Sequence, residues 1–80
     1  MPYYAEQFVG RLIEAVGVLQ NHPQLGRHVP EADEREDVRE LIFQSYRIIY
    51  LADTKQVSIL TVIHGSRDLA GQTAKPWEIG

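Results

Sequence analysis

Apolar residues in the first quarter of the chain follow the spacing of an α-helix over residues 4–21. One apolar side of this helix is formed by Ala5, Phe8, Leu12, Ala15, Val16 and Leu19. Pro23 disfavours a helical conformation in the residue before it, which predicts where the helix ends. Gly10 and Gly17 each weaken the helix by about 1 kcal/mol, so their spacing predicts that something packs closely against them.

The second half of the chain alternates with period two, which indicates β-strands. The expected strands cover residues 38–43, 46–51 and 56–63, and the short turns between them make neighbouring strands antiparallel. The last two strands are apolar on both faces, so the helix covers one face and the tail (residues 70–80) or another molecule covers the other. We therefore predict an α+β fold within a single domain, residues 1–80, in which one long amphipathic helix packs on a three-stranded antiparallel meander.

Composition and charge narrow the class of protein. The chain has 80 residues and a net charge of −3. It contains no cysteine, which excludes disulfides, zinc–thiolate sites and cysteine nucleophiles. The negative charge argues against broad nucleic-acid binding. Residues 31–40 hold six acidic and two basic residues, which we interpret as a solvated loop or helix end. No apolar segment approaches the length of a membrane span and no signal peptide is recognisable, so we expect a cytoplasmic protein.

The sequence offers few candidates for catalysis or metal binding. His22, His28 and His64 lack the clustered spacing of a metal-ligand set, and no serine lies in a Gly-x-Ser-x-Gly elbow. No pair of carboxylates lies in apolar surroundings, where a raised pKa would be expected. We expect neither a metal nor another cofactor.

Polar residues at two strand ends are the remaining candidates. Arg47 begins the second strand and Arg67 follows the third, so an antiparallel meander brings both to the same end of the sheet, with His64 between them. Two guanidinium groups and an imidazole suit phosphate, an RNA backbone or an acidic partner. The alternative is internal salt bridges, for instance Arg67 with Asp68, or Arg47 with Glu40 across the first hairpin.

Several motifs resemble one family. The stretch VRELIFQSYRIIYLADTKQVSILTVIHGSRDL resembles the C-terminal sheet of the ParE/RelE toxin superfamily of bacterial type II toxin–antitoxin systems, also called plasmid stabilisation proteins. The pattern consists of Arg39 and Leu41 in one strand, SYRIIY at 45–50, and residues 57–68, which end in HGSRD. The upstream AEQFVGRLIEAVGVLQNHPQLGR resembles the second helix of the family and the turn that follows, so the likeness covers residues 5–69.

The resemblance also implies a truncated RelE/ParE-like fold. Members of the family begin with an edge strand and a first helix, and this sequence has no counterpart for either. The sheet edge that this leaves exposed is expected to pair with a strand of an antitoxin or of a second copy of the chain.

The two branches of the superfamily differ in activity. The RelE branch cleaves messenger RNA on the ribosome, and Arg47, His64 and Arg67 would be the catalytic residues here. However, this chain lacks the lysines of the first hairpin strand and the tail tyrosine of that branch. The ParE branch inhibits DNA gyrase by binding it, and the HGSRD ending with the missing lysines places the chain nearer to this branch.

The resemblance therefore implies a ParE-like toxin that binds a cognate antitoxin and DNA gyrase, attenuated by its truncation. Arg47, His64 and Arg67 are the candidates for contact with the target or a phosphate, and Tyr46, Tyr50 and Trp77 are the candidates for partner binding. Two alternatives are a RelE-type messenger RNA endoribonuclease and a non-toxic homodimeric remnant of the fold.

Overall fold

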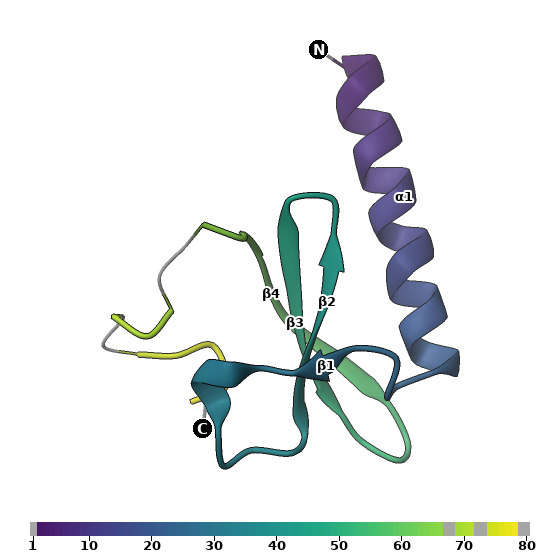
Figure 1. Cartoon of the computed structure of the whole chain (residues 1–80). Coiled ribbons are helices and arrows are strands. Elements are labelled where there is room, and N and C mark those ends of the chain that lie inside the picture. Colours follow the sequence, from purple (N-terminus) through teal and green to yellow (C-terminus); the bar gives the residue numbers. More distant parts are fainter. Residues whose placement is uncertain (1, 67–68, 72–73, 79–80) are drawn as a thin grey trace.

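A computed structural model describes residues 2–66, 69–71 and 74–78 of the chain, which form one helix and one antiparallel sheet (Figure 1). The elements are α1 (Pro2–Asn21), β1 (Arg27–His28), the 3-10 helix η1 (Pro30–Ala32), β2 (Val38–Phe43), β3 (Tyr46–Ala52) and β4 (Val57–His64). The strands lie in chain order, β1-β2-β3-β4. This confirms the predicted α+β class, with every predicted helix and strand end within two residues of its observed position.

The fourth strand, β1, was not predicted from the sequence. It has only two residues, and it pairs with β2 by placing Arg27 opposite Glu40 and His28 opposite Arg39. Two exposed polar residues carry no alternation, so this strand leaves no periodic signal.

α1 covers one face of the sheet with the C-terminal part of its apolar side. Leu19 packs on Ile48 and Tyr50 of β3, and all three side chains are fully buried. Around them lie the partly buried side chains of Leu12, Ala15, Leu41, Phe43, Ala52, Val57 and Val62. Leu19 is the only fully buried side chain in residues 7–21, so α1 is fixed to the sheet mainly near its C-terminal end.

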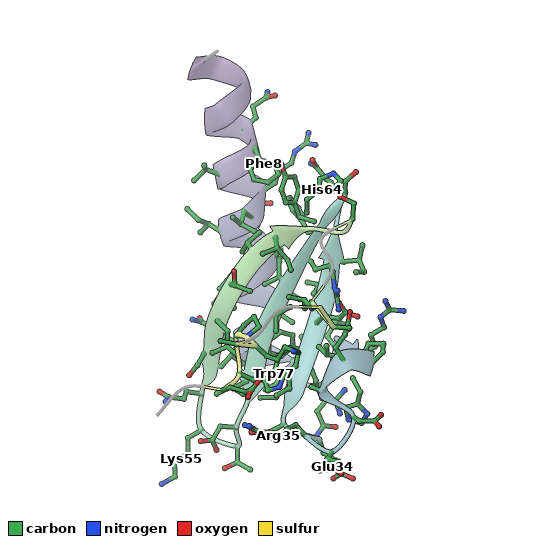
Figure 2. All side chains as sticks on the ribbon, turned by 90° about the vertical axis from the view of Figure 1, so that its left-hand side faces the viewer. Phe8, Glu34, Arg35, Lys55, His64 and Trp77 are labelled. Atoms are coloured by element: carbon green, nitrogen blue, oxygen red, sulfur yellow. The ribbon has the colours of Figure 1, made fainter. Side chains whose placement is uncertain are left out.

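The tail and the segment after β1 cover the opposite face, as Figure 2 shows for Trp77. A second apolar cluster there consists of Val29, Ala32, Val38, Ile49, Leu69 and Trp77. Of the two coverings expected for this face, the tail is therefore the one observed. β3 lies between the two clusters, which explains why its sequence is apolar on both faces.

The N-terminal half of α1 extends beyond the turn between β2 and β3 (Figure 1). Phe8 still contacts the rings of Phe43 and Tyr46, but Val9 and Ile13 are exposed. A Cβ atom added to either helix glycine would meet nothing within 4 Å. The expected close packing against these glycines is therefore not provided by the part of the chain that the structure describes.

A buried tyrosine joins the loop after α1 to the sheet. The Tyr50 hydroxyl donates to the carbonyl oxygen of Pro23 at 2.8 Å and accepts the N–H of Gly26 at 2.9 Å. A Cβ atom on Gly26 would lie 2.4 Å from the carbonyl oxygen of Glu40 and 2.6 Å from the Tyr50 hydroxyl. Only glycine allows this close approach, which explains the Leu-Gly-Arg turn after the helix.

Candidate functional site at one end of the sheet

The turn between β2 and β3 meets the end of β4 at one end of the sheet. Gln44 turns the chain with a φ of 55°, and the Gly65 N–H donates to the carbonyl oxygen of Ser45 at 2.8 Å. A Cβ atom on Gly65 would lie 3.2 Å from that oxygen, tighter than ordinary packing. The glycine in the HGS sequence therefore holds the end of β4 against the hairpin turn.

Four rings form a cluster at this end, which we call the aromatic rim: Phe8, Phe43, Tyr46 and His64. Tyr46 lies edge-on to Phe8 and to His64, with ring centroids 5.2 Å and 5.5 Å apart. Phe8 also contacts Phe43, with centroids 5.6 Å apart. Figure 2 shows Phe8 and His64 together at the far end of the sheet from Lys55. His64 is exposed, so the rim combines apolar ring surface with an imidazole that a partner can reach.

Ser66, two residues after the end of β4, sets the proton position on the imidazole. The Ser66 N–H donates to Nδ1 of His64 at 3.2 Å, and the Ser66 hydroxyl oxygen lies 2.8 Å from the same nitrogen. Because Nδ1 accepts from the backbone, the neutral ring carries its proton on Nε2. His64 can therefore donate a hydrogen bond to a carboxylate, carbonyl or phosphate oxygen of a partner.

Arg47 lies at the same end of the sheet but on the other face. Tyr46 is the strand partner of His64, whereas Arg47 is the partner of Ile63. Because side chains alternate between faces, Arg47 points to the tail side and His64 to the α1 side. The structure thus does not bring these two predicted site residues together. The third, Arg67, lies outside the described residues together with Asp68.

The Arg47 guanidinium forms a buried ionic network instead. Its Nε donates to Oε1 of Glu40, and Nη1 and Nη2 donate to the two carboxylate oxygens of Glu31 at 3.0 Å and 2.8 Å. The other Glu40 oxygen accepts from Nε of Arg27 at 2.8 Å. The Arg47 side chain is 9% exposed and that of Glu40 is 0% exposed. Of the interpretations left open for Arg47, the internal salt bridge with Glu40 is the one observed.

This network also changes the interpretation of the acidic segment. Glu31 and Glu40 mark its two ends, and both carboxylates bind Arg47; the Glu40 side chain is fully buried and that of Glu31 is partly buried. The acids between them are exposed, as expected for a loop. Glu31 was not predicted as a partner of Arg47 because sixteen residues separate the two in the chain. The available signal was the presence of an arginine within an otherwise apolar strand, since a buried cation needs carboxylate partners.

The Arg47 guanidinium lowers the pKa of Glu31 below its ordinary value of 4.5, through their hydrogen bonds. A lowered pKa in the folded state stabilises the protein above the unfolded-state pKa, and that stabilisation is lost as pH falls through the folded-state pKa. We expect the melting temperature of the wild type to drop below about pH 4.5. Glu31→Gln should reduce this drop while lowering the melting temperature at pH 7, as thermal scans between pH 7 and 3 would measure. An unchanged pH profile in the variant would contradict this.

The three aromatic candidates for partner binding occupy different environments. Tyr50 is fully buried under α1, and Trp77 is 6% exposed inside the tail-side cluster. A partner that approaches the folded protein therefore meets little of either side chain, and both stabilise the fold. Tyr46 is half-buried in the aromatic rim, so it is the one of the three that a partner can reach.

Within the described residues, no group of three histidine, aspartate or glutamate side chains lies close enough together to hold a metal ion. No helix in this part of the chain is both long and apolar enough to cross a bilayer.

Comparison with known proteins gives one family. Residues 2–69 match the model of the ParE toxin of the type II toxin–antitoxin system parDE. No curated protein and no solved structure matches the chain. The matched range includes α1 and all four strands, and it ends directly before the tail.

Proposed function

Since the chain belongs to the ParE toxin family of type II toxin–antitoxin systems, we propose that it acts as a binding toxin in the cytoplasm. In this proposal it is held by a cognate antitoxin and, when released, binds DNA gyrase. The family match over residues 2–69 is the observation that carries the proposal.

The state of Arg47 supports binding over RNA cleavage. General acid–base cleavage of RNA needs cations that can reach the phosphate in the transition state. Arg47 instead uses its Nε, Nη1 and Nη2 atoms on two carboxylates of the same chain. Breaking a buried ion pair of this kind costs about 3–5 kcal/mol, so the guanidinium is held by the fold.

We assign the target contact to the aromatic rim. Tyr46 and His64 present ring surface and a hydrogen-bond donor at the end of the sheet where the HGSRD motif begins. Exposed aromatic groups with a polar tip are typical of the residues that dominate protein interfaces. Arg67 remains a predicted contact that follows from its motif.

We assign antitoxin binding to the outer edge of β4. In the described part of the chain β4 pairs only with β3, so its other side has unpaired backbone groups. The strand VSILTVIH contains no acidic residue, lysine, arginine or proline, the residues that usually protect an edge. A register shift leaves Leu60 without a partner on β3, which divides the edge into two short segments. An extended antitoxin segment can add to each of them.

A single experiment separates the candidate functions. The chain is expressed in bacteria under an inducible promoter, and purified protein is added to a gyrase supercoiling assay. We expect growth arrest with a DNA damage response and inhibited supercoiling. His64→Ala should weaken inhibition by at least about 10-fold, if it removes a well-placed contact worth about 1.4 kcal/mol. Lys55→Ala, an exposed change at the opposite end of the sheet (Figure 2), is the matched control and should leave inhibition unchanged.

Other outcomes identify the alternatives. Growth arrest with cleaved messenger RNA and active gyrase would identify the RelE-type ribonuclease, and Arg67→Ala should then abolish cleavage. Normal growth and unaffected gyrase would identify a non-toxic remnant of the fold.

A further inference from the structure

α1 carries a second apolar stripe that its own sheet does not cover. Successive helix residues are turned by about 100°, so Val9, Gly10, Val16 and Gly17 all lie within about 60° of Ile13 around the axis. The core-facing residues of α1 lie about 100–160° away from Ile13. Ile13 is 65% exposed and Val9 is 49% exposed. Between Val9 and Gly17 this face of the helix is thus apolar and at least partly exposed, and positions Glu6 and Gln20, each about 20° from Ile13 around the axis, mark its two polar ends.

This stripe borders a groove between α1 and β4 of about 340 Å³. The groove is lined by Leu12, Ile13, Val16, Gly17, Gln20, Ile59 and Val62. None of these residues is charged, and Ile59 is also exposed. On the face of the sheet that α1 covers, the region beside β4 is therefore left open. A molecule that fills the groove must present a matching uncharged, apolar surface.

The surface area indicates how much the chain leaves uncovered. A compact monomer of 9.1 kDa is expected to expose about 4,900 Å², whereas this chain exposes 5650 Å². Its radius of gyration is 12.9 Å, compared with about 11.6 Å for a compact chain of this length. The excess of roughly 750 Å² matches the area of about 800 Å² that each partner buries in a standard interface.

We propose that a second copy of this chain occupies the groove, with the two α1 helices packed antiparallel about a two-fold axis beside Ile13. This arrangement pairs residues at equal distances on either side of position 13. Val9 then faces Gly17 of the second copy, and Val16 faces Gly10 of the second copy. Each branched side chain meets a position where an added Cβ would find open space in the monomer. The two glycines thus receive the close packing that the isolated chain does not provide.

Charge is compatible with this arrangement. The residues that line the groove are uncharged, so no carboxylate or ammonium group is desolvated beside Ile13, at the centre of the pair. The exposed acids of residues 33–37 lie at the far end of the sheet from Phe8, as the position of Glu34 in Figure 2 shows. Two copies with a net charge of −3 each therefore meet away from their acidic segments. The inference does not depend on the cellular target proposed above.

The first test compares two valines of α1 by sedimentation equilibrium. Wild-type protein should be a dimer. Val9→Glu should raise the dimer dissociation constant by about 100-fold, because each of two buried carboxylates costs at least about 1.4 kcal/mol. Val18→Glu is the matched control, since Val18 is 45% exposed on the same helix but turned about 140° away from Ile13. Circular dichroism should show the same helix content in both variants.

The second test identifies the geometry by crosslinking. The chain contains no cysteine, so single-cysteine variants report only the new position. In an antiparallel pair about 8–10 Å apart, the two copies of position 13 come within disulfide reach. Ile13→Cys should form a disulfide-linked dimer under mild oxidation, and Val18→Cys should not.

Two results would overturn the proposal. Monomeric wild-type protein at its highest soluble concentration would mean that a different molecule covers the stripe. A dimer that is unaffected by Val9→Glu and not crosslinked through Ile13→Cys would place the interface elsewhere, for example at the β4 edge.

Discussion

Replacing Glu40 by alanine is expected to lower the free energy of unfolding by about 3–5 kcal/mol. Both Glu40 oxygens bind guanidinium groups, and its side chain is fully buried. Its removal leaves Arg47, whose side chain is 9% exposed, with one carboxylate partner, the partly exposed Glu31. A domain of 80 residues has a total free energy of unfolding of about 4–12 kcal/mol. The expected loss is a large part of this total, so the variant should be marginally stable or unfolded. Urea denaturation followed by circular dichroism measures the change.

Asp37→Ala is the matched control for this prediction. Asp37 forms two hydrogen bonds at 2.9 Å with Arg35, but both side chains are more than 40% exposed. An exposed ion pair contributes about 0–1 kcal/mol, so this variant should unfold almost like the wild type. Equal losses in the two variants would mean that the burial of Glu40 adds nothing, and the account of the network would then be incorrect.

The network explains why Arg47 follows a tyrosine in a strand that is otherwise apolar. From the sequence, Arg47 was a candidate for binding phosphate, an RNA backbone or an acidic partner at the end of the sheet, and a salt bridge with Glu40 was the alternative. The pairing of β2 with β3 decides in favour of the salt bridge, because Arg47 and Glu40 point to the same face and Glu31 approaches from η1. Because the Arg47 guanidinium is bound to Glu40 and Glu31 in the folded protein, it is not free to bind a substrate.

Hydrophobic periodicity predicted the helix, the three long strands and their antiparallel order. Each of these elements is long enough to show its period several times, and each has a clear turn at its ends. β1 has two residues and therefore no period. The sequence did not decide whether the tail or another molecule covers the second face of the sheet, because a single tryptophan among glycine and proline residues gives no pattern. Its position follows from the tail-side cluster, which needs the Leu69 and Trp77 side chains.

The sequence predicted where the candidate site lies, at one end of the sheet, but not which side chains meet there. The meander brings residue 47 and residue 64 to one end of the sheet, as expected. However, Tyr46 is opposite His64, so Arg47 is one residue out of phase and points to the other face. The exact register of β3 against β4 decides whether residues 47 and 64 share a face of the sheet. The sequence does not define the length of the turn between these strands, so it does not define the register. The contribution of Phe8 from α1 also required coordinates, because it depends on how the helix lies across the hairpin.

We expect the aromatic rim to form only when α1 is attached to the sheet at Leu19. Replacing Leu19 tests this expectation. Leu19→Ala should lower the free energy of unfolding by about 2–5 kcal/mol, because a fully buried side chain between Ile48 and Tyr50 is lost and a cavity remains. Alanine is the better helix former, so the loss cannot come from helix propensity.

Val18→Ala is the neighbouring control, since Val18 is 45% exposed, and it should change the stability by less than about 0.5 kcal/mol. Chemical denaturation gives both values, and nuclear Overhauser contacts between the two rings report whether Phe8 stays against Tyr46. If Leu19→Ala left the stability unchanged, contacts at the N-terminal end of α1 would be holding the helix. The rim would then be an independent contact between Phe8 and the hairpin, and it would not depend on the docking of α1 at Leu19.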